Sequence, residues 1–309
     1  MLLSLGQQIS RHNSGEVECP LGLTLPLMIL GRFFRTSGCT FHDGDEEIAV
    51  LNERPSRFDG FIWHDCAYIF LMIDLLMEGS FQAFAVPHHL AMLTTLIVTV
   101  VLTAYARGGP DEGNLKVIRY VLGALLLISV ALDPILIVVR YGAEELGREM
   151  VINDSLPFYL CDVVAIFLAF ALFTKNQRLA EIGYLWAIAG TLQGLIMPTL
   201  WFDHGELEFY TFFLQHGGGP VAAIFLVWGL GIVPLKGAMR RAIYWSLGYM
   251  VVVMFINWII GANYGFLNHK PAGGTPFDHM GPWPYYLVTL QVIAYALYFF
   301  LLKIAPRKK

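Results

Sequence analysis

Long apolar stretches, each bounded by polar or charged residues, dominate the chain from residue 88 onward. Each is about 20 residues long, the length that a helix needs to cross the hydrocarbon of a bilayer. The pattern has no alternating segments of about ten residues, which a membrane β-barrel would require. The sequence therefore predicts an all-α polytopic membrane bundle with seven transmembrane spans at 88–106, 117–140, 156–174, 180–200, 210–233, 241–262 and 284–304.

Charged residues between the predicted spans indicate the orientation of the bundle. If the segment before the first span lies outside, the inner side carries Arg107, Lys116, Arg119, Lys175, Arg178, Lys236, Arg240, Arg241, Lys303, Arg307, Lys308 and Lys309. The outer side then carries only Arg140, Arg148 and Lys270. Because cytoplasmic connections are enriched in Lys and Arg, we expect a multi-pass protein of the cell membrane with its N-terminus outside and its C-terminus inside.

Residues 1–80 differ in character from the seven-helix membrane domain at 81–309. They are largely polar, and their apolar run at 20–31 is too short to cross a bilayer and contains Pro26. We expect an interfacial N-terminal extension. Two alternatives are an eighth span at 61–77 and a true start at Met72 or Met77.

Composition and motifs narrow the classes of function. The chain is 56% apolar and 14% charged, with a net charge of −4, and a soluble domain would carry roughly a quarter charged residues. It has no HExxH, P-loop or dinucleotide glycine motif, and its four cysteines are scattered. We therefore expect no metal, no cofactor and no nucleic-acid partner, and the sequence does not indicate an oligomeric state.

Polar side chains within the predicted spans gather in the outer half of the bundle, and the inner halves carry almost nothing comparable. Each is a functional candidate, because a polar group in hydrocarbon is costly. Cys161 and Asp162 are expected about one and a half turns into the third span. We expect a shared pocket or hydrogen-bond network. The alternatives are an inert buried thiol for Cys161, interfacial positions for the histidines and interhelical hydrogen bonds for Gln193 and Asn257.

Two glycine-containing patterns suggest local structure. Gly183, Ala187, Gly190 and Gly194 share one face of the fourth span, which predicts close helix packing. His216 precedes Gly217-Gly218-Gly219-Pro220, a run that disfavours regular helix. We expect unwound backbone there, with free N–H groups that cradle an oxyanion or a phosphate.

The connection between the last two spans, 263–285, is rich in Pro and Gly and is predicted to be non-helical. One interpretation is a lid over the outer pocket, with Lys270 facing a lipid phosphate. The other is a re-entrant turn held by interfacial aromatic residues.

Several ordered blocks, from about Phe81 to the C-terminus, resemble the bacterial YwaF-like integral membrane proteins. The segment 156–162, LPFYLCD, is similar to that family's LPLHLCD-type signature. The later blocks are FFLQHG at 212–217, NW at 257–258, NYG at 263–265, KPAG at 270–273 and GPWP at 281–284. Two departures are Tyr159, in place of the usual His, and Gly218-Gly219-Pro220, in place of apolar residues.

The resemblance implies a lipid-modifying function. Eukaryotic relatives in a transmembrane acyltransferase branch are implicated in moving acyl chains onto ether phospholipids, and androgen-induced lipid hydrolases are more distantly similar. Carried over, Cys161 would be the nucleophile and His216 its base, acting on a membrane phospholipid or another acyl lipid. The residues expected to bind this substrate are Asp133, Asp162, Gln193, Asn257, Asn263, Lys270 and His88.

Two other classes of function stay open. A transporter or permease would use Asp133, Gln193 and Asn257 along its path, and a non-enzymatic membrane binding protein would use the pocket for ligand capture. A retinal protein is disfavoured, because 284–302 contains no lysine for a Schiff base.

Overall fold

The computed structural model describes residues 81–307, except 201 and 272–274, and three short strands nearer the N-terminus. The chain separates into two units, 1–73 and 74–309. In the first unit, β1 (Gly15–Val17), β2 (Phe41–Asp43) and β3 (Glu46–Ile48) pair antiparallel in that order. The sequence did not predict these strands. The expected interfacial extension, the alternative span at 61–77 and the alternative start sites otherwise lie outside the described residues.

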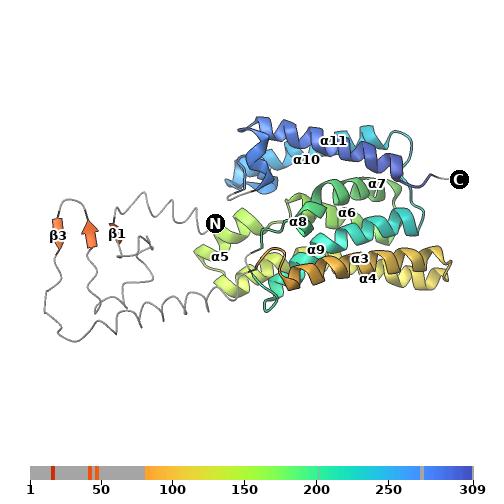
Figure 1. Ribbon diagram of the computed structural model, residues 1–309, viewed down its shortest axis with the longest axis horizontal. Helices are drawn as coiled ribbons and strands as arrows, with labels where there is room; N and C mark the ends of the chain where they lie inside the picture. The colour runs from red at the N-terminus through yellow and green to blue at the C-terminus, as the bar shows by residue number, and fades with distance from the viewer. Residues whose placement is uncertain are drawn as a thin grey trace. The chain divides into compact units, whose positions relative to one another are not determined.

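The second unit is helical in the part that the structure describes (Figure 1), and each predicted span has a helical counterpart. Six helices are long and apolar enough to cross a membrane, or seven if a bent pair counts as one span. The all-α membrane bundle is therefore confirmed, whereas its orientation in the membrane stays a prediction. The elements are α3 (Val86–Arg107), α4 (Glu112–Tyr141), α5 (Glu145–Met150), the π-helix η2 (Val151–Ser155), α6 (Leu160–Thr174), α7 (Gln177–Trp186), the π-helix η3 (Ala187–Thr191), α8 (Leu192–Ile196), α9 (Leu207–Ile224), the π-helix η4 (Phe225–Gly229), α10 (Ala238–Ile260), the 3₁₀ helices η5 (Tyr264–Phe266) and η6 (Pro276–Met280), and α11 (Tyr285–Ile304).

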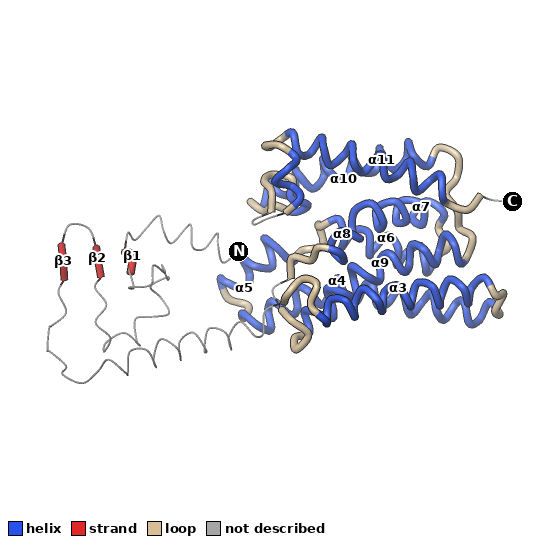
Figure 2. Tube along the Cα trace, in the orientation of Figure 1, coloured by secondary structure: helices blue, strands red, loops and turns tan. Residues whose placement is uncertain are grey.

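Helices α6, α7 and α9 form the centre of the bundle, between α3 and α4 on one side and α10 and α11 on the other (Figures 1 and 2). The core is built on their apolar side chains, and Trp186 and Phe225 are among its largest members. The Trp186 indole donates to Ser246 of α10 at 3.0 Å, and Ser246 bonds Tyr298 of α11 at 3.1 Å. Many large apolar residues of α3, α10 and α11 are exposed, as expected for helices in contact with lipid.

The third predicted span, 156–174, begins at a break, and a further helical segment precedes it. Residues Glu145–Ser155 and α6 meet at an angle of 69°. Leu156 is extended, with a ψ of 149°, because the ring of Pro157 disfavours the helical region for the preceding residue. Helix α6 consequently begins at Leu160, and Cys161 lies in its first turn. The expected position one and a half turns inside the helix is wrong.

Helix α9 runs without interruption through Gly217–Pro220. The prediction of unwound backbone there is wrong, and so is the oxyanion cradle, because helical N–H groups are already bonded to carbonyls. The glycines instead admit neighbouring helices. A Cβ added at Gly217 would lie 2.4 Å from Oγ1 of Thr95 on α3, and one at Gly218 would lie 3.2 Å from Leu126 on α4.

The small residues of the fourth span have the packing role that was predicted. A Cβ added at Gly183 would lie 2.5 Å from Leu168 Cδ2, and one at Gly190 would lie 2.6 Å from Leu160 Cδ2. Both leucines belong to α6. The missing side chains therefore let α6 approach α7 and η3 closely.

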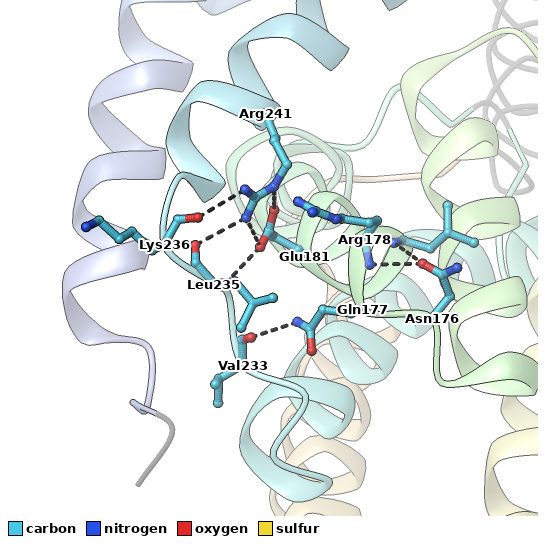
Figure 3. Close-up of polar contacts among 9 residues, drawn as sticks. Asn176, Gln177, Arg178, Glu181, Val233, Leu235, Lys236 and Arg241 are labelled. Carbon is cyan, nitrogen blue, oxygen red and sulfur yellow. Dashed lines mark hydrogen bonds and ion pairs between the residues drawn. The ribbon is translucent and has the colours of Figure 1, made fainter.

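Buried charge also lies in the half of the bundle where the sequence predicted almost none. Glu181 of α7 has no exposed surface. Arg241 of α10 donates to its two carboxylate oxygens at 2.6 and 2.7 Å, and the backbone N–H of Leu235 donates at 2.9 Å (Figure 3). This cluster fixes α10 and the connection before it to α7. Arg119, counted among the inner-side cations at the start of the predicted span 117–140, lies two turns inside α4 and is also buried.

Candidate functional site

The candidate residues lie towards one end of the bundle. Because successive spans run in opposite directions, this end contains the starts of α3, α6, α9 and α11 and the ends of α4, α8 and α10. We call it the site end, and it lies near α5 and α8 in Figure 1. The other end contains the connections 108–111, 175–176 and 230–237 and the C-terminus.

Cys161 is the second residue of α6, and it is the only free cysteine in the part of the chain described by the structure. The first N–H groups of a helix have no carbonyl partner within it. In α6 the Asp162 N–H bonds the Tyr159 carbonyl at 3.1 Å, whereas the N–H groups of Leu160 and Cys161 have no carbonyl partner among the described residues. A helix N-terminus favours negative charge, and reactive cysteines are often found at such positions. The position of Cys161 therefore suits a nucleophile.

Asp162 ties the start of α6 to the middle of α9. Its Oδ2 accepts from the Tyr159 N–H at 3.1 Å, which caps the helix. Its Oδ1 accepts from the side chain of Gln215, which is buried and directly precedes His216. Sequence reasoning missed Gln215 as a site residue, although it lies in the FFLQHG block. The Asp162–Gln215 bond places the turn carrying Cys161 beside the turn carrying His216.

The His216 ring is held by its own helix. It stacks on the Phe212 ring with 4.0 Å between centroids, and Nδ1 lies 3.0 Å from the Phe212 carbonyl oxygen. With Nδ1 as the donor, Nε2 keeps its lone pair and is the nitrogen that can accept a proton. Among the described residues, no hydrogen bond joins Cys161 to His216. The two groups lie on turns that the Asp162–Gln215 bond links.

Replacing Gly194 with alanine is expected to displace the His216 ring. The added Cβ would lie 2.2 Å from its Cδ2 and 2.7 Å from its Nε2, and the stack on Phe212 limits where the ring can move. We expect a loss of about 1–3 kcal/mol in stability, as for overpacked cores, measured as a lower Tm in detergent. Gly248→Ala is the matched control, since a Cβ on that α10 residue meets nothing within 4 Å. Equal Tm values for the two variants would contradict the position described for the His216 ring.

Three candidate substrate-binding residues have side chains that the described protein groups do not fully occupy. Asp133 is exposed on α4, which continues through Pro134, and it faces Ser155. Gln193 is exposed on α8 and makes no side-chain hydrogen bond to described residues. The Lys270 ammonium lies 5.8 Å from the centroid of the Tyr286 ring. These side chains are open to a ligand.

Asn257 is engaged with the backbone of Tyr264. Its Nδ2 donates to the Tyr264 carbonyl at 2.9 Å, and its Oδ1 accepts from the Tyr264 N–H at 2.8 Å. The Tyr264 hydroxyl in turn accepts from the Leu156 N–H at 2.9 Å and donates to the Ile152 carbonyl at 2.8 Å. Burial raises the pKa of Tyr264 to about 12, so the phenol stays protonated and can donate. Tyr264 therefore holds the break that precedes α6.

His88 and Asn263 are likewise occupied within the protein. His88 is fully buried; its Nδ1 accepts from the Phe84 N–H at 2.9 Å, and its Nε2 lies 2.8 Å from the Leu195 carbonyl oxygen. This contact links α3 to α8. Asn263 accepts from the His269 N–H at 3.2 Å and donates to the His269 carbonyl at 2.9 Å. It orders a connection that was predicted to be non-helical but contains the 3₁₀ helices η5 and η6.

Comparison of the sequence with known families places the chain in one of them. Residues 83–302 match the sequence model of the TMEM164 family. The match includes Cys161, Asp162, Gln215 and His216. Neither the curated proteins nor the solved structures contain a significant match to the chain.

Proposed function

Because this chain belongs to the TMEM164 family of transmembrane proteins, we propose that it is a multi-pass enzyme of the cell membrane that transfers or hydrolyses an acyl chain of a phospholipid. The observation that carries the proposal is the position of Cys161. It lies in the first turn of α6, at the break in the span, and the Asp162–Gln215 bond ties this turn to the one that carries His216. The resemblance of 156–162 to the YwaF-like signature, and to its acyltransferase relatives, supports the same assignment of Cys161 as the nucleophile.

In the proposed reaction, the Cys161 thiol gives its proton to Nε2 of His216, directly or through a water molecule. The thiolate attacks the ester carbonyl, the ester C–O bond breaks, and the departing lysophospholipid oxygen takes the proton from the imidazolium. The acyl group then remains on Cys161 as a thioester. The N–H groups of Leu160 and Cys161, which have no carbonyl partner among the described residues, would stabilise the oxyanion.

The second half of the reaction regenerates the enzyme. An acceptor hydroxyl or water attacks the thioester and gives its proton to His216, and the sulfur leaves and is reprotonated. A lysophospholipid acceptor gives acyl transfer, and water gives hydrolysis. Catalytic hydrogen bonds often tighten only when substrate is bound, so this sequence of steps does not require a Cys161–His216 hydrogen bond in the free protein.

A trapping experiment tests the proposal. The full chain in nanodiscs is incubated with a phospholipid that carries a labelled acyl chain, and its peptides are analysed by mass spectrometry. We expect label on the peptide containing Cys161, released by hydroxylamine as expected for a thioester. A variant with Cys19, Cys39 and Cys66 all replaced by serine is the matched control and should keep the label. Acyl turnover with no label on Cys161 would refute the assignment.

A transporter is the second candidate, favoured by the break between Glu145–Ser155 and α6. Discontinuous helices form the substrate sites of many transporters. Buried Glu181 adds a polar group in the other half of the bundle, but its carboxylate is already paired with Arg241. Solute flux in proteoliposomes that survives Cys161→Ala, without acyl turnover, would favour transport.

A further inference from the structure

A groove lies where α3 meets η4, at the opposite end of the bundle from Cys161. Its volume is about 570 Å³, and it is lined by residues that include Val100, Thr103, Arg107 and Trp228. The two elements approach closely at Gly229, where an added Cβ would lie 3.2 Å from the Ala106 Cβ. A π-helical turn such as η4 is rare and is often found at functional sites.

A series of threonines on α3 shows what is unusual about this groove. Thr95, Thr99 and Thr103 are spaced four residues apart and therefore share one face of the helix. Thr95 donates to the Ala91 carbonyl at 2.9 Å, and Thr99 donates to the Thr95 carbonyl at 2.7 Å. Thr103 lines the groove, and its hydroxyl is buried and has no hydrogen-bond partner among the described residues. Rotation to the other common helical rotamer of threonine would turn the hydroxyl outward, where an acceptor oxygen of a ligand would satisfy it.

Charge at the mouth of the groove favours an anion. Arg107 is exposed and forms no ion pair with the residues that the structure describes. The described cations at this end are Arg107, Lys116, Arg119, Lys175, Arg178, Lys236, Arg240, Arg241, Lys303 and Arg307, whereas its described acids are Asp111, Glu112 and Glu181. A membrane-adjacent cluster of Lys and Arg attracts anionic lipids.

The rest of the groove suits hydrocarbon. Val100 and Ile224 supply aliphatic wall, and Val100 lies seven residues before Arg107, about 10 Å away along the helix axis. Trp228 adds an amphipathic ring of the kind found where membrane meets water. A cation and an unpaired hydroxyl towards one end, and an apolar wall towards the other, match the two parts of a phospholipid.

We infer that this groove binds an anionic membrane phospholipid, with its phosphate against Arg107 and the Thr103 hydroxyl and one acyl chain along Val100 and Ile224. This site is separate from the proposed catalytic centre and does not depend on acyl chemistry. Because Arg107 is a cation and the neighbouring charge is mostly positive, a lipid with a net negative headgroup binds more tightly than a zwitterionic lipid of the same chain length.

Lipid binding to the delipidated full chain tests the inference, with dioleoylphosphatidylglycerol as probe and native mass spectrometry as readout. We expect Arg107→Gln to weaken binding about tenfold, as for loss of a charge-assisted hydrogen bond. Thr103→Val removes the hydroxyl and should weaken it by a smaller factor. Lys116→Gln, an exposed cation of the same end that is outside the groove lining, is the matched control and should leave binding unchanged.

A groove-filling variant and a comparison with inorganic phosphate complete the experiment. Ala104→Trp fills the groove from an exposed position that should tolerate it, and it should abolish binding while the Tm stays unchanged. Normal lipid binding by Ala104→Trp would overturn the inference. Equal weakening by Arg107→Gln and Lys116→Gln would also overturn it, because it would point to general surface charge. Inorganic phosphate binding as tightly as the lipid would exclude a role for the apolar wall.

Discussion

Replacing Cys161 with alanine is expected to lower the rate of acyl transfer roughly 1000-fold or more, as for loss of a catalytic nucleophile in other enzymes. Alanine leaves the backbone of α6 unchanged, so its first-turn N–H groups and the Asp162–Gln215 bond should remain. Binding of the phospholipid should therefore persist while thioester formation stops. Single-turnover transfer from a labelled phospholipid in nanodiscs measures the rate.

Cys161→Ser is the companion variant for this experiment. It keeps a nucleophilic atom at the same position but replaces the thiol with a much weaker nucleophile, so it should fold normally and remain slow. Gly248→Ala serves as the reference for a substitution that alters no site contact. If Cys161→Ala kept more than a tenth of the wild-type rate, the nucleophile would have to be another residue.

Replacing Arg241 with leucine is expected to lower the free energy of unfolding by about 3–5 kcal/mol, the usual cost of breaking a buried ion pair from one side. The variant leaves the Glu181 carboxylate without exposed surface and with only the Leu235 N–H as a described donor. Thermal unfolding in detergent, followed by tryptophan fluorescence, measures the loss.

Arg140→Leu is the matched control for Arg241→Leu. The two arginine side chains are similarly exposed, 32% for Arg140 and 23% for Arg241. The carboxylate partners of Arg140 are 47% exposed in Glu206 and 12% exposed in Glu208, whereas Glu181 has no exposed surface. Pairs of this kind contribute up to about 1 kcal/mol. The double variant Glu181→Leu with Arg241→Leu should recover much of the lost stability, because no buried charge remains. Equal losses for the two single arginine variants would refute the argument from burial.

The membrane spans could be predicted because a bilayer requires long apolar helices, and this requirement leaves a strong signal in sequence. The break before α6 leaves a weaker signal in the sequence. Hydropathy stays high across 156–174, and the helix start depends on the local backbone restriction that Pro157 imposes on Leu156. At Gly217–Pro220 the sequence predicted a break where the structure has none. Local propensity disfavours a helix there, but α9 is uninterrupted, and its glycines pack closely against Thr95 and Leu126.

The sequence could predict which end of the bundle carries the candidate residues, but not which contacts each side chain makes. A buried polar side chain that holds a loop and one that holds a substrate have the same sequence signature, because both oppose the hydrophobic pattern. Only the contacts separate Asn257 and His88, which bond to backbone, from Asp133 and Gln193, which stay exposed. The Glu181–Arg241 pair was missed because its partners are 60 residues apart in the chain.

The shortness of α6 has a consequence for where chemistry can occur. Its 15 residues give a rise of about 22 Å, whereas the hydrocarbon layer is about 30 Å deep. If its C-terminal end reaches one boundary of that layer, its first turn lies about 8 Å below the other. Irregular backbone is tolerated at that depth only beside protein or water, and here the Tyr264 hydroxyl is the protein partner of the Leu156 N–H and the Ile152 carbonyl. The ester linkages of a bilayer lipid lie near the boundary itself, so in the proposed reaction an ester has to move about 8 Å inward to reach the Cys161 sulfur.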